Sequence, residues 1–171
     1  MKEDVRERAS RVRLVCSDFD GVFTDAMVYT DQNGVESVRC SRRDSLGINM
    51  LKRAGIGVHV ISKETNPVVA ARCKKMGVAC DHGVESGDGK VEIMQRVAQE
   101  AGVDLSQIAY VGDDVNDIAA LKIVGFAVTV ADGHSLVKEV THHITQARGG
   151  EHAIREVCEL ILQAQGRPIS Y

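Results

Sequence analysis

The sequence predicts an α/β fold, a parallel β-sheet flanked by helices. Runs such as 12–17 and 57–62 are apolar almost throughout, which is typical of strands buried on both faces. Segments with helical periodicity separate these runs, and such alternation indicates parallel strands joined by helices. The run 12–17 leads into Asp18 and Asp20, and a third run, 107–111, leads into Asp113 and Asp114. Both acidic pairs therefore lie at strand ends, where open α/β sheets bind ligands.

Length and composition are those of one globular domain over 1–171. The chain is 44% hydrophobic and 26% charged, and its net charge of −3 with scattered basic residues argues against a nucleic-acid partner. No apolar stretch is long enough to span a membrane, and the charged first residues lack a signal-type segment, so we expect a cytoplasmic protein without a membrane partner. The five cysteines show no Cys-x-x-Cys spacing, which argues against a disulfide framework or a zinc cluster.

The first third of the chain contains a lead-in helix, the first strand and a hairpin. Asn33-Gly34 separates two β-rich runs and is a strong hairpin-turn signal, so a β-hairpin flap over about 26–40 follows the first acidic loop. A helix comes next, and Gly55 ends it. The elements expected here are a helical lead-in over 1–11, a helix over 44–54, and strands over 12–17, 26–30, 35–40 and 57–62.

The rest of the chain alternates helix and strand. Asn66-Pro67 opens a helix that Gly77 ends. The expected elements are helices over 67–76, 88–101, 115–124, 135–140 and 153–163, strands over 78–80, 107–111, 126–130 and 143–145, and a polar tail over about 165–171.

The first acidic loop has the pattern of a reaction centre. Asp18 and Asp20 repel each other at a strand end unless a cation or a shared proton lies between them, so the pair favours a hard divalent metal such as magnesium. One carboxylate can attack while the other, two residues on, handles the proton. The alternative is a plain turn, because Asp-Gly pairs commonly follow strands.

Further polar residues suited to phosphate chemistry follow other strand ends or begin the next helix, and a parallel sheet brings its carboxyl ends to one edge. Each has a structural alternative: Ser62 as a helix cap, Lys90 as a solvated helix residue, and the later acidic cluster as a helix start. Their order along the chain favours a common site over these separate explanations. The set consists of Asp18, Asp20, Ser62, Lys63, Lys90, Asp113, Asp114, Asn116 and Asp117.

In this order the motifs resemble those of the haloacid dehalogenase (HAD) superfamily of phosphohydrolases, and the match spans nearly the whole chain. The chain is most similar to capless phosphatases of 3-deoxy-manno-octulosonate 8-phosphate and of nine-carbon sialic-type sugar phosphates. The resemblance implies a HAD-like, Rossmann-like fold with no cap domain, since the hairpin and one helix already fill the stretch between Asp18 and Ser62. It rests on Asp18-Phe19-Asp20-Gly21-Val22, Ser62, Lys90, Gly112-Asp113-Asp114-Val115-Asn116-Asp117, Arg43-Asp44-Ser45-Leu46-Gly47-Ile48 and Gly149-Gly150.

The resemblance implies roles for the acids. Asp18 would be the nucleophile that forms an aspartyl-phosphate, and Asp20 would protonate the leaving oxygen and later deprotonate a water. Mg²⁺ would be held by Asp18, Asp113 and the backbone carbonyl of Asp20, and would offset the repulsion between nucleophile and phosphate. Asp114 and Asp117 would support this site.

The resemblance also implies which residues hold the phosphate. The Ser62 hydroxyl and the Lys90 ammonium would contact the phosphoryl oxygens. Amides around Gly21 would add an anion nest.

The substrate implied is a small phosphorylated sugar acid, of the octulosonate 8-phosphate or nonulosonate 9-phosphate type. Arg43 and Lys63 are candidates for its carboxylate, because a guanidinium binds a carboxylate bidentately. The alternative for Arg43 is an ion pair with Asp44. Two departures from the family pattern, Ser62-Lys63-Glu64 and Gly149-Gly150-Glu151-His152, argue against the octulosonate assignment. Ser62 with Asn66-Pro67 favours the sialic-type branch.

An uncapped site needs another cover, and the resemblance implies a homotetramer in which the hairpin and a neighbour's tail shield it. Met27, Val28 and Tyr29 are candidate apolar contacts between subunits.

Two other functions are compatible with parts of the pattern. One is a non-catalytic oligomerisation domain, like the related domain fused to some acylneuraminate cytidylyltransferases; the intact Asp18, Asp20 and Lys90 favour catalysis instead. The other is a phospho-accepting receiver, against which the chain order of the acids argues, because receivers carry their acidic pair before the accepting Asp.

Overall fold

The computed structural model describes residues 3–85 and 88–170, so the first residues of the predicted lead-in and Tyr171 at the end of the predicted tail lie outside it. A six-stranded sheet, with all its strand pairs parallel, forms the centre of the fold. Its spatial order is β5 (Ala79–Asp81), β4 (Gly57–Ile61), β1 (Leu14–Ser17), β6 (Ile108–Gly112), β7 (Phe126–Thr129) and β8 (His143–Ile144). The order reverses between β1 and β6, and the ligand crevice of such sheets lies at that reversal.

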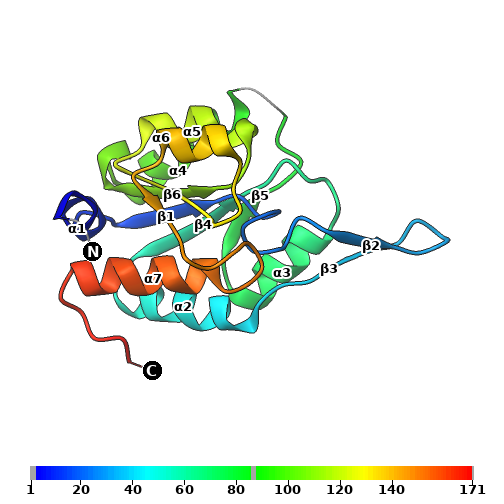
Figure 1. Cartoon of the computed structure of the whole chain (residues 1–171), viewed down its shortest axis with the longest axis horizontal. Coiled ribbons are helices and arrows are strands. Elements are labelled where there is room, and N and C mark those ends of the chain that lie inside the picture. Colours follow the sequence, from blue (N-terminus) through cyan, green and yellow to red (C-terminus); the bar gives the residue numbers. More distant parts are fainter. Residues whose placement is uncertain (1–2, 86–87, 171) are drawn as a thin grey trace.

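Helices cover both faces of the sheet, as predicted (Figure 1). One face carries α1 (Glu3–Ser10), α2 (Arg42–Arg53), α3 (Val68–Met76) and α7 (Ala153–Ala164). The other carries α4 (Gly89–Ala101), α5 (Ile118–Ile123) and α6 (Ser135–Val140). Two 3₁₀ turns, η1 (Leu105–Gln107) and η2 (Val115–Asp117), flank β6.

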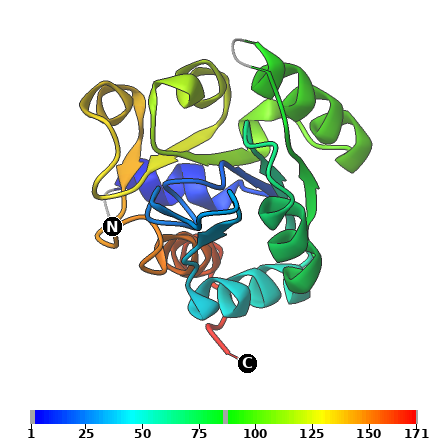
Figure 2. The same ribbon diagram turned by 90° about the vertical axis from the view of Figure 1, so that its right-hand side faces the viewer.

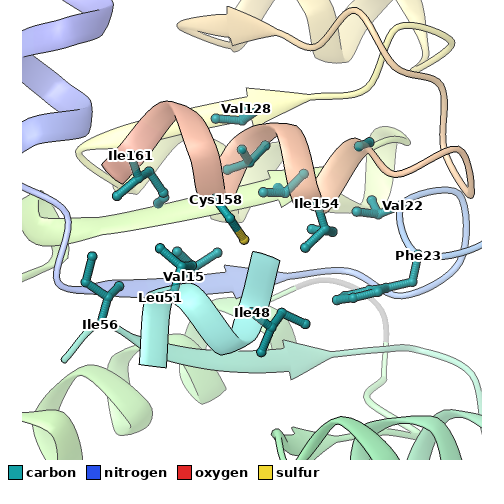
Figure 3. Packing of buried hydrophobic residues seen from close by; sticks show 14 of the residues in the cluster. Val15, Val22, Phe23, Ile48, Leu51, Ile56, Val128, Ile154, Cys158 and Ile161 are labelled. Atoms are coloured by element: carbon teal, nitrogen blue, oxygen red, sulfur yellow. The ribbon is translucent and has the colours of Figure 1, made fainter. Parts of the chain in front are cut away.

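Alternate residues of each central strand enter two separate cores. On β1, Val15 joins the core under α2 and α7, whereas Leu14 and Cys16 join the core under α4 and α5. Figure 3 shows the first core, where Leu51 of α2 and Ile154 of α7 lie above β1. Burying such an aliphatic side chain contributes roughly 1.5–3 kcal/mol, so the helices hold the sheet, and the site at its edge, firmly in place.

α2 begins two residues before the predicted helix, because Ser41 caps it: its Oγ accepts a hydrogen bond from the Arg43 N–H. Asp44 is therefore inside the first turn and fully buried. Its Oδ1 accepts from the backbone N–H of Arg155 at 2.9 Å, which joins α2 to the start of α7. The alternative of an Arg43–Asp44 ion pair is thus wrong, because Asp44 points into the core and Arg43 is exposed.

The predicted hairpin is present as β2 (Val28–Thr30) and β3 (Glu36–Val38), which pair antiparallel and project away from the sheet (Figure 1). Its strands are shorter than predicted. The turn is closed by Asp31, whose carbonyl accepts from the Gly34 N–H at 3.0 Å, and Gly34 takes the left-handed conformation with φ +77°. The hairpin's role as a flap stays a prediction.

Most other predicted boundaries lie within two residues of the observed ones. The predicted helix over 115–124 is the exception, because it starts as the 3₁₀ turn η2 and becomes α-helical only at Ile118. Among the described residues, every helix is too short or too polar to cross a bilayer.

Candidate active site

The two acidic loops meet at the carboxyl edge of the sheet. Asp18 directly follows β1 and Asp113 directly follows β6, and these strands pair in register with Ser17 opposite Val111. The Asp18 N–H donates to the Val111 carbonyl at 2.9 Å, so the pairing continues up to the site. Figure 2 views the molecule from this end, with the hairpin toward the reader.

Lys90 joins the two loops. It lies in the first turn of α4, where the residue is only 3% exposed. Its Nζ donates to Asp18 Oδ2 at 2.6 Å and to Asp117 Oδ1 at 2.7 Å. The alternative of a solvated helix lysine is therefore wrong: the ammonium is buried between two carboxylates, where ion pairing offsets the cost of removing it from water.

Asp117 is a fully buried hub of hydrogen bonds. Besides Lys90, its Oδ1 accepts from the Tyr110 hydroxyl at 2.8 Å. Its Oδ2 accepts from the backbone N–H groups of Asp113 at 2.9 Å and Asp114 at 3.3 Å. Both carboxylate oxygens are thus occupied, and the residue fixes the loop that carries Asp113.

Carboxylates outnumber cations in the cluster. Oxygens of Asp18, Asp113 and Asp117 lie within 4.8 Å of one another, with the Lys90 ammonium among them. Burial, and then the Asp117 charge, raises the pKa of Asp18 to about 7, even though Lys90 opposes the rise. Burial and the charge of Asp18 raise the pKa of Asp113 to about 8.

Such a surplus of buried negative charge fits a divalent cation. The Asp113 carboxylate receives no hydrogen bond from the residues that the structure describes, so its lone pairs are available. Asp18 Oδ2 accepts a hydrogen bond from Lys90, and its Oδ1 accepts one from the Phe19 N–H at 2.7 Å. Each oxygen keeps a further lone pair. Because four donors already occupy Asp117, Asp18 and Asp113 are the better ligands.

Gly21 allows the two acidic loops to approach each other. It has φ +73°, and a Cβ at this position would overlap the Asp113 carboxylate. Its N–H, predicted to join an anion nest, donates to Thr24 Oγ1 at 3.2 Å. A phosphate oxygen would have to replace Thr24 as the acceptor, and the role of Gly21 in phosphate binding stays a prediction.

Asp20 lies beside the cavity and is partly exposed. Its Oδ1 accepts from the hydroxyl of Thr24 at 3.2 Å, and burial raises its pKa, with the Thr24 hydrogen bond opposing the rise. The same Thr24 oxygen accepts from the Ala26 N–H at 3.1 Å. Sequence reasoning missed Thr24; its only signal is a small polar residue after the apolar pair Val22-Phe23.

A cavity of about 320 Å³ opens in front of the acids. Ser62 lines it and is buried, but it is not the cap of the next helix: Asn66 Oδ1 accepts from the Val68 N–H at 3.0 Å, while Ser62 Oγ accepts from Glu64 N–H at 3.1 Å. Accepting this bond leaves the Ser62 hydroxyl hydrogen available to donate. The lining residues are Asp18, Asp20, Ser62, Lys63, Glu64, Thr65 and Asn116.

The two candidates for carboxylate binding differ in position. Lys63 lines the cavity, as expected for a substrate contact, whereas Arg43 is exposed on α2 and is not among the lining residues. Glu64 and Thr65 were not predicted. Their signal was weak, because a Glu-Thr pair after a strand is ordinary loop sequence.

The glycine pair after β8 supports the first acidic loop. A Cβ on Gly149 would overlap the Gly21 carbonyl, and one on Gly150 would lie 2.7 Å from the backbone nitrogen of Asp25. The Gly150 N–H donates to the Val22 carbonyl at 3.1 Å. Only glycines permit this approach, so a loop near residue 150 holds the loop that starts at Asp18.

Comparisons with known proteins identify the family. A family model for haloacid dehalogenase-like hydrolase matches residues 83–156. The 3-deoxy-D-manno-octulosonate 8-phosphate phosphatase of Escherichia coli K12 is 34% identical over 164 residues, 96% of this chain and 86% of that protein. The structure of the phosphatase from Yersinia pestis superposes with a TM-score of 0.93 at 33% identity, covering 98% of this chain and 89% of that one.

A further solved structure is the octulosonate phosphatase of Moraxella catarrhalis in complex with a magnesium ion, a phosphate ion and a KDO molecule. It superposes with a TM-score of 0.91 at 32% identity, covering 97% of this chain and 94% of that one. Such identity over nearly the full length of both proteins shows more than a shared fold. The chain therefore belongs to the haloacid dehalogenase-like hydrolase family and is a phosphoric monoester hydrolase.

Proposed function

We propose that this enzyme hydrolyses a small sugar-acid phosphate, of the octulosonate 8-phosphate or nonulosonate 9-phosphate type, through an aspartyl-phosphate. The observation that carries the proposal is the buried Asp18–Lys90–Asp117 cluster beside a cavity. The similarity to octulosonate phosphatases supports the substrate class.

The chemistry follows from the positions of the acids. A free oxygen lone pair of Asp18 attacks phosphorus, and the bond between phosphorus and the sugar oxygen breaks. Asp20, whose pKa is raised by burial, gives its proton to that oxygen. Asp20 then takes a proton from the water that attacks the acyl phosphate, which returns Asp18 as a carboxylate and releases inorganic phosphate.

Asp18, Asp113 and the carbonyl of Asp20 would hold Mg²⁺, with Asp114 and Asp117 in support. When bound, the ion supplies positive charge that offsets the repulsion between Asp18 and the phosphate dianion. The Lys90 ammonium lies at Asp18, where it would add positive charge and stabilise the phosphoryl group in transfer. The Ser62 hydroxyl donates to a phosphoryl oxygen.

Substrate contacts beyond the phosphate are assigned to the cavity rim. Lys63 lines the cavity and binds the sugar carboxylate, whereas Arg43 would take part only if the substrate extends toward α2. Glu64 and Thr65 supply acceptors for sugar hydroxyls. The hairpin, with Met27, Val28 and Tyr29 exposed, is assigned to a homotetramer that covers the site.

The alternative of a non-catalytic oligomerisation domain does not account for the buried cluster. A lysine held between two buried carboxylates is weak as a source of stability, since apolar residues of similar volume serve as well or better. Its position beside an open cavity is explained by catalysis.

A substrate panel tests the proposal. Phosphate release from eight- and nine-carbon sugar-acid phosphates is measured beside hexose phosphates, with and without Mg²⁺. We expect kcat/KM for at least one sugar acid to exceed that for hexose phosphates at least tenfold, and activity to require the metal. Equal rates on all substrates would overturn the substrate class, while leaving the enzyme a phosphatase.

A further inference from the structure

Tyr110 is a buried polar residue for which the proposed reaction has no direct use. It lies in β6 between apolar neighbours, and its side chain is fully buried in the core under α4 and α5. A phenol in such a place loses its hydration, so its hydroxyl needs a partner. That partner is Asp117 Oδ1, at 2.8 Å.

The same oxygen also receives Lys90. The Lys90 Nζ lies 2.7 Å from Asp117 Oδ1 and 2.6 Å from Asp18 Oδ2, so the ammonium is shared between two carboxylates. The Tyr110 hydroxyl and the Lys90 ammonium both donate hydrogen bonds to Asp117 Oδ1, so each weakens the interaction of that oxygen with the other. Without the hydroxyl, that oxygen would interact more strongly with Lys90 and draw the ammonium away from Asp18.

We propose that Tyr110 is a positioning residue: by sharing Asp117 Oδ1 with Lys90, its hydroxyl keeps the Lys90 ammonium at Asp18 and at the phosphoryl group in transfer. The inference rests on the proposed aspartyl-phosphate chemistry, but not on the identity of the sugar. Tyr110 does not touch the substrate, because the ring is enclosed in the core behind the cluster.

The test is the variant Tyr110→Phe, which removes the hydroxyl and keeps the ring that packs in the core. Turnover is followed with p-nitrophenyl phosphate and Mg²⁺, because this substrate needs no sugar recognition and has a good leaving group. We expect kcat to fall on the order of tenfold with KM changed less than twofold, because the loss falls on the transition state.

Inhibition separates positioning from a structural role. Orthovanadate imitates the five-coordinate transition state and inorganic phosphate imitates the product, so Tyr110→Phe weakens inhibition by vanadate about tenfold and leaves inhibition by phosphate within twofold. The control is Thr141→Val, which removes a hydroxyl that donates to the Lys138 carbonyl at 3.3 Å; Thr141 lines a different cavity from the one at Asp18. We expect it to alter Tm without altering kcat or vanadate inhibition.

A crystal structure of Tyr110→Phe gives a readout that does not depend on activity. We expect the Lys90 Nζ–Asp18 Oδ2 distance to lengthen from 2.6 Å. An unchanged distance together with unchanged kcat and vanadate inhibition would overturn the positioning role. A wild-type enzyme that hydrolyses p-nitrophenyl phosphate but no sugar-acid phosphate would instead refute the proposed substrate and leave the Tyr110 result intact.

Discussion

Among single residues, Asp18 has the most direct part in the proposed chemistry. Replacing it with Asn keeps the shape and the acceptor for the Phe19 N–H but removes the nucleophile. We expect Asp18→Asn to lower kcat by at least about 10³-fold, and circular dichroism and the unfolding transition to show a folded protein. Turnover within tenfold of wild type would exclude the covalent mechanism.

The residues that sequence reasoning found and those it missed differ in what specifies them. Asp18, Lys90 and Asp113 were predicted together because the strand ends of a parallel sheet converge. Each strand end can be recognised from its own stretch of sequence. Tyr110 acts through a hydrogen bond to Asp117, and a tyrosine in a buried strand is indistinguishable in sequence from a packing residue. Thr24 bonds to Asp20 within the same loop, but a small polar residue there is also typical of an ordinary turn. Glu64 was missed because a Glu-Thr pair after a strand is ordinary loop sequence.

At the scale of the elements, Asp44 connects α2 to α7. Burial raises its pKa to about 6, although the Arg155 N–H and the Arg72 charge oppose the rise, and its Oδ2 is buried without a partner among the described residues. Because the folded protein binds this proton more tightly than the unfolded chain, its contribution to stability is complete below about pH 4 and is lost as the pH rises through about 6.

The variant Asp44→Asn tests this connection. Asn keeps an acceptor for the Arg155 N–H and cannot ionise. In the wild type, the free energy of unfolding should fall by at most about 3 kcal/mol as the pH rises from 4 to 6, and the variant should not show this fall. Urea unfolding at several pH values measures it. Parallel pH profiles for variant and wild type would contradict the prediction.

Several large apolar side chains of the hairpin region are exposed, including Met27, Val28 and Val35 and Tyr29 at 72% exposure. If it forms the subunit contact, the double variant Val28→Glu, Tyr29→Glu dissociates the oligomer, because each charge would have to be buried. Sedimentation velocity at micromolar concentration measures the change. The control Leu136→Glu alters an exposed apolar residue on α6 and leaves the oligomer intact; a monomeric wild type would refute the contact.

Secondary structure was predictable wherever a local signal ends an element, as Gly77 does for α3. It was less so where side-chain hydrogen bonds, and not apolar periodicity, set the start of a helix. The acidic loop after β6 takes a 3₁₀ turn in which Asp114 and Asp117 form a capping box and the Asp117 side chain accepts hydrogen bonds from the backbone of Asp113 and Asp114. The spacing of apolar residues does not reveal that geometry.

For the whole molecule, metal binding and stability are linked. The pKa values of about 7 for Asp18 and about 8 for Asp113 apply without metal, so the cluster retains protons at pH 6 that a divalent ion must displace. We expect Mg²⁺ at about 100 times its Kd to stabilise the fold by about 2.7 kcal/mol, with weaker binding at pH 6 than at pH 8.5.

Thermal unfolding with and without Mg²⁺ at both pH values measures this effect, and EDTA should reverse it together with activity. The variant Asp113→Asn serves as a control, because it removes a proposed metal ligand and one of the buried charges. A metal-induced rise in Tm of equal size at both pH values would contradict the assignment of these carboxylates.

The contact of Gly149 and Gly150 with residues 21–25 bears on how the enzyme is made. During synthesis, Asp18 leaves the ribosome long before Gly149 and Gly150, which contact its loop. Catalytic competence therefore arrives late in translation, and a product truncated just ahead of Gly149 would carry Asp18, Lys90 and Asp113 yet lack the contacts that hold the Asp18 loop.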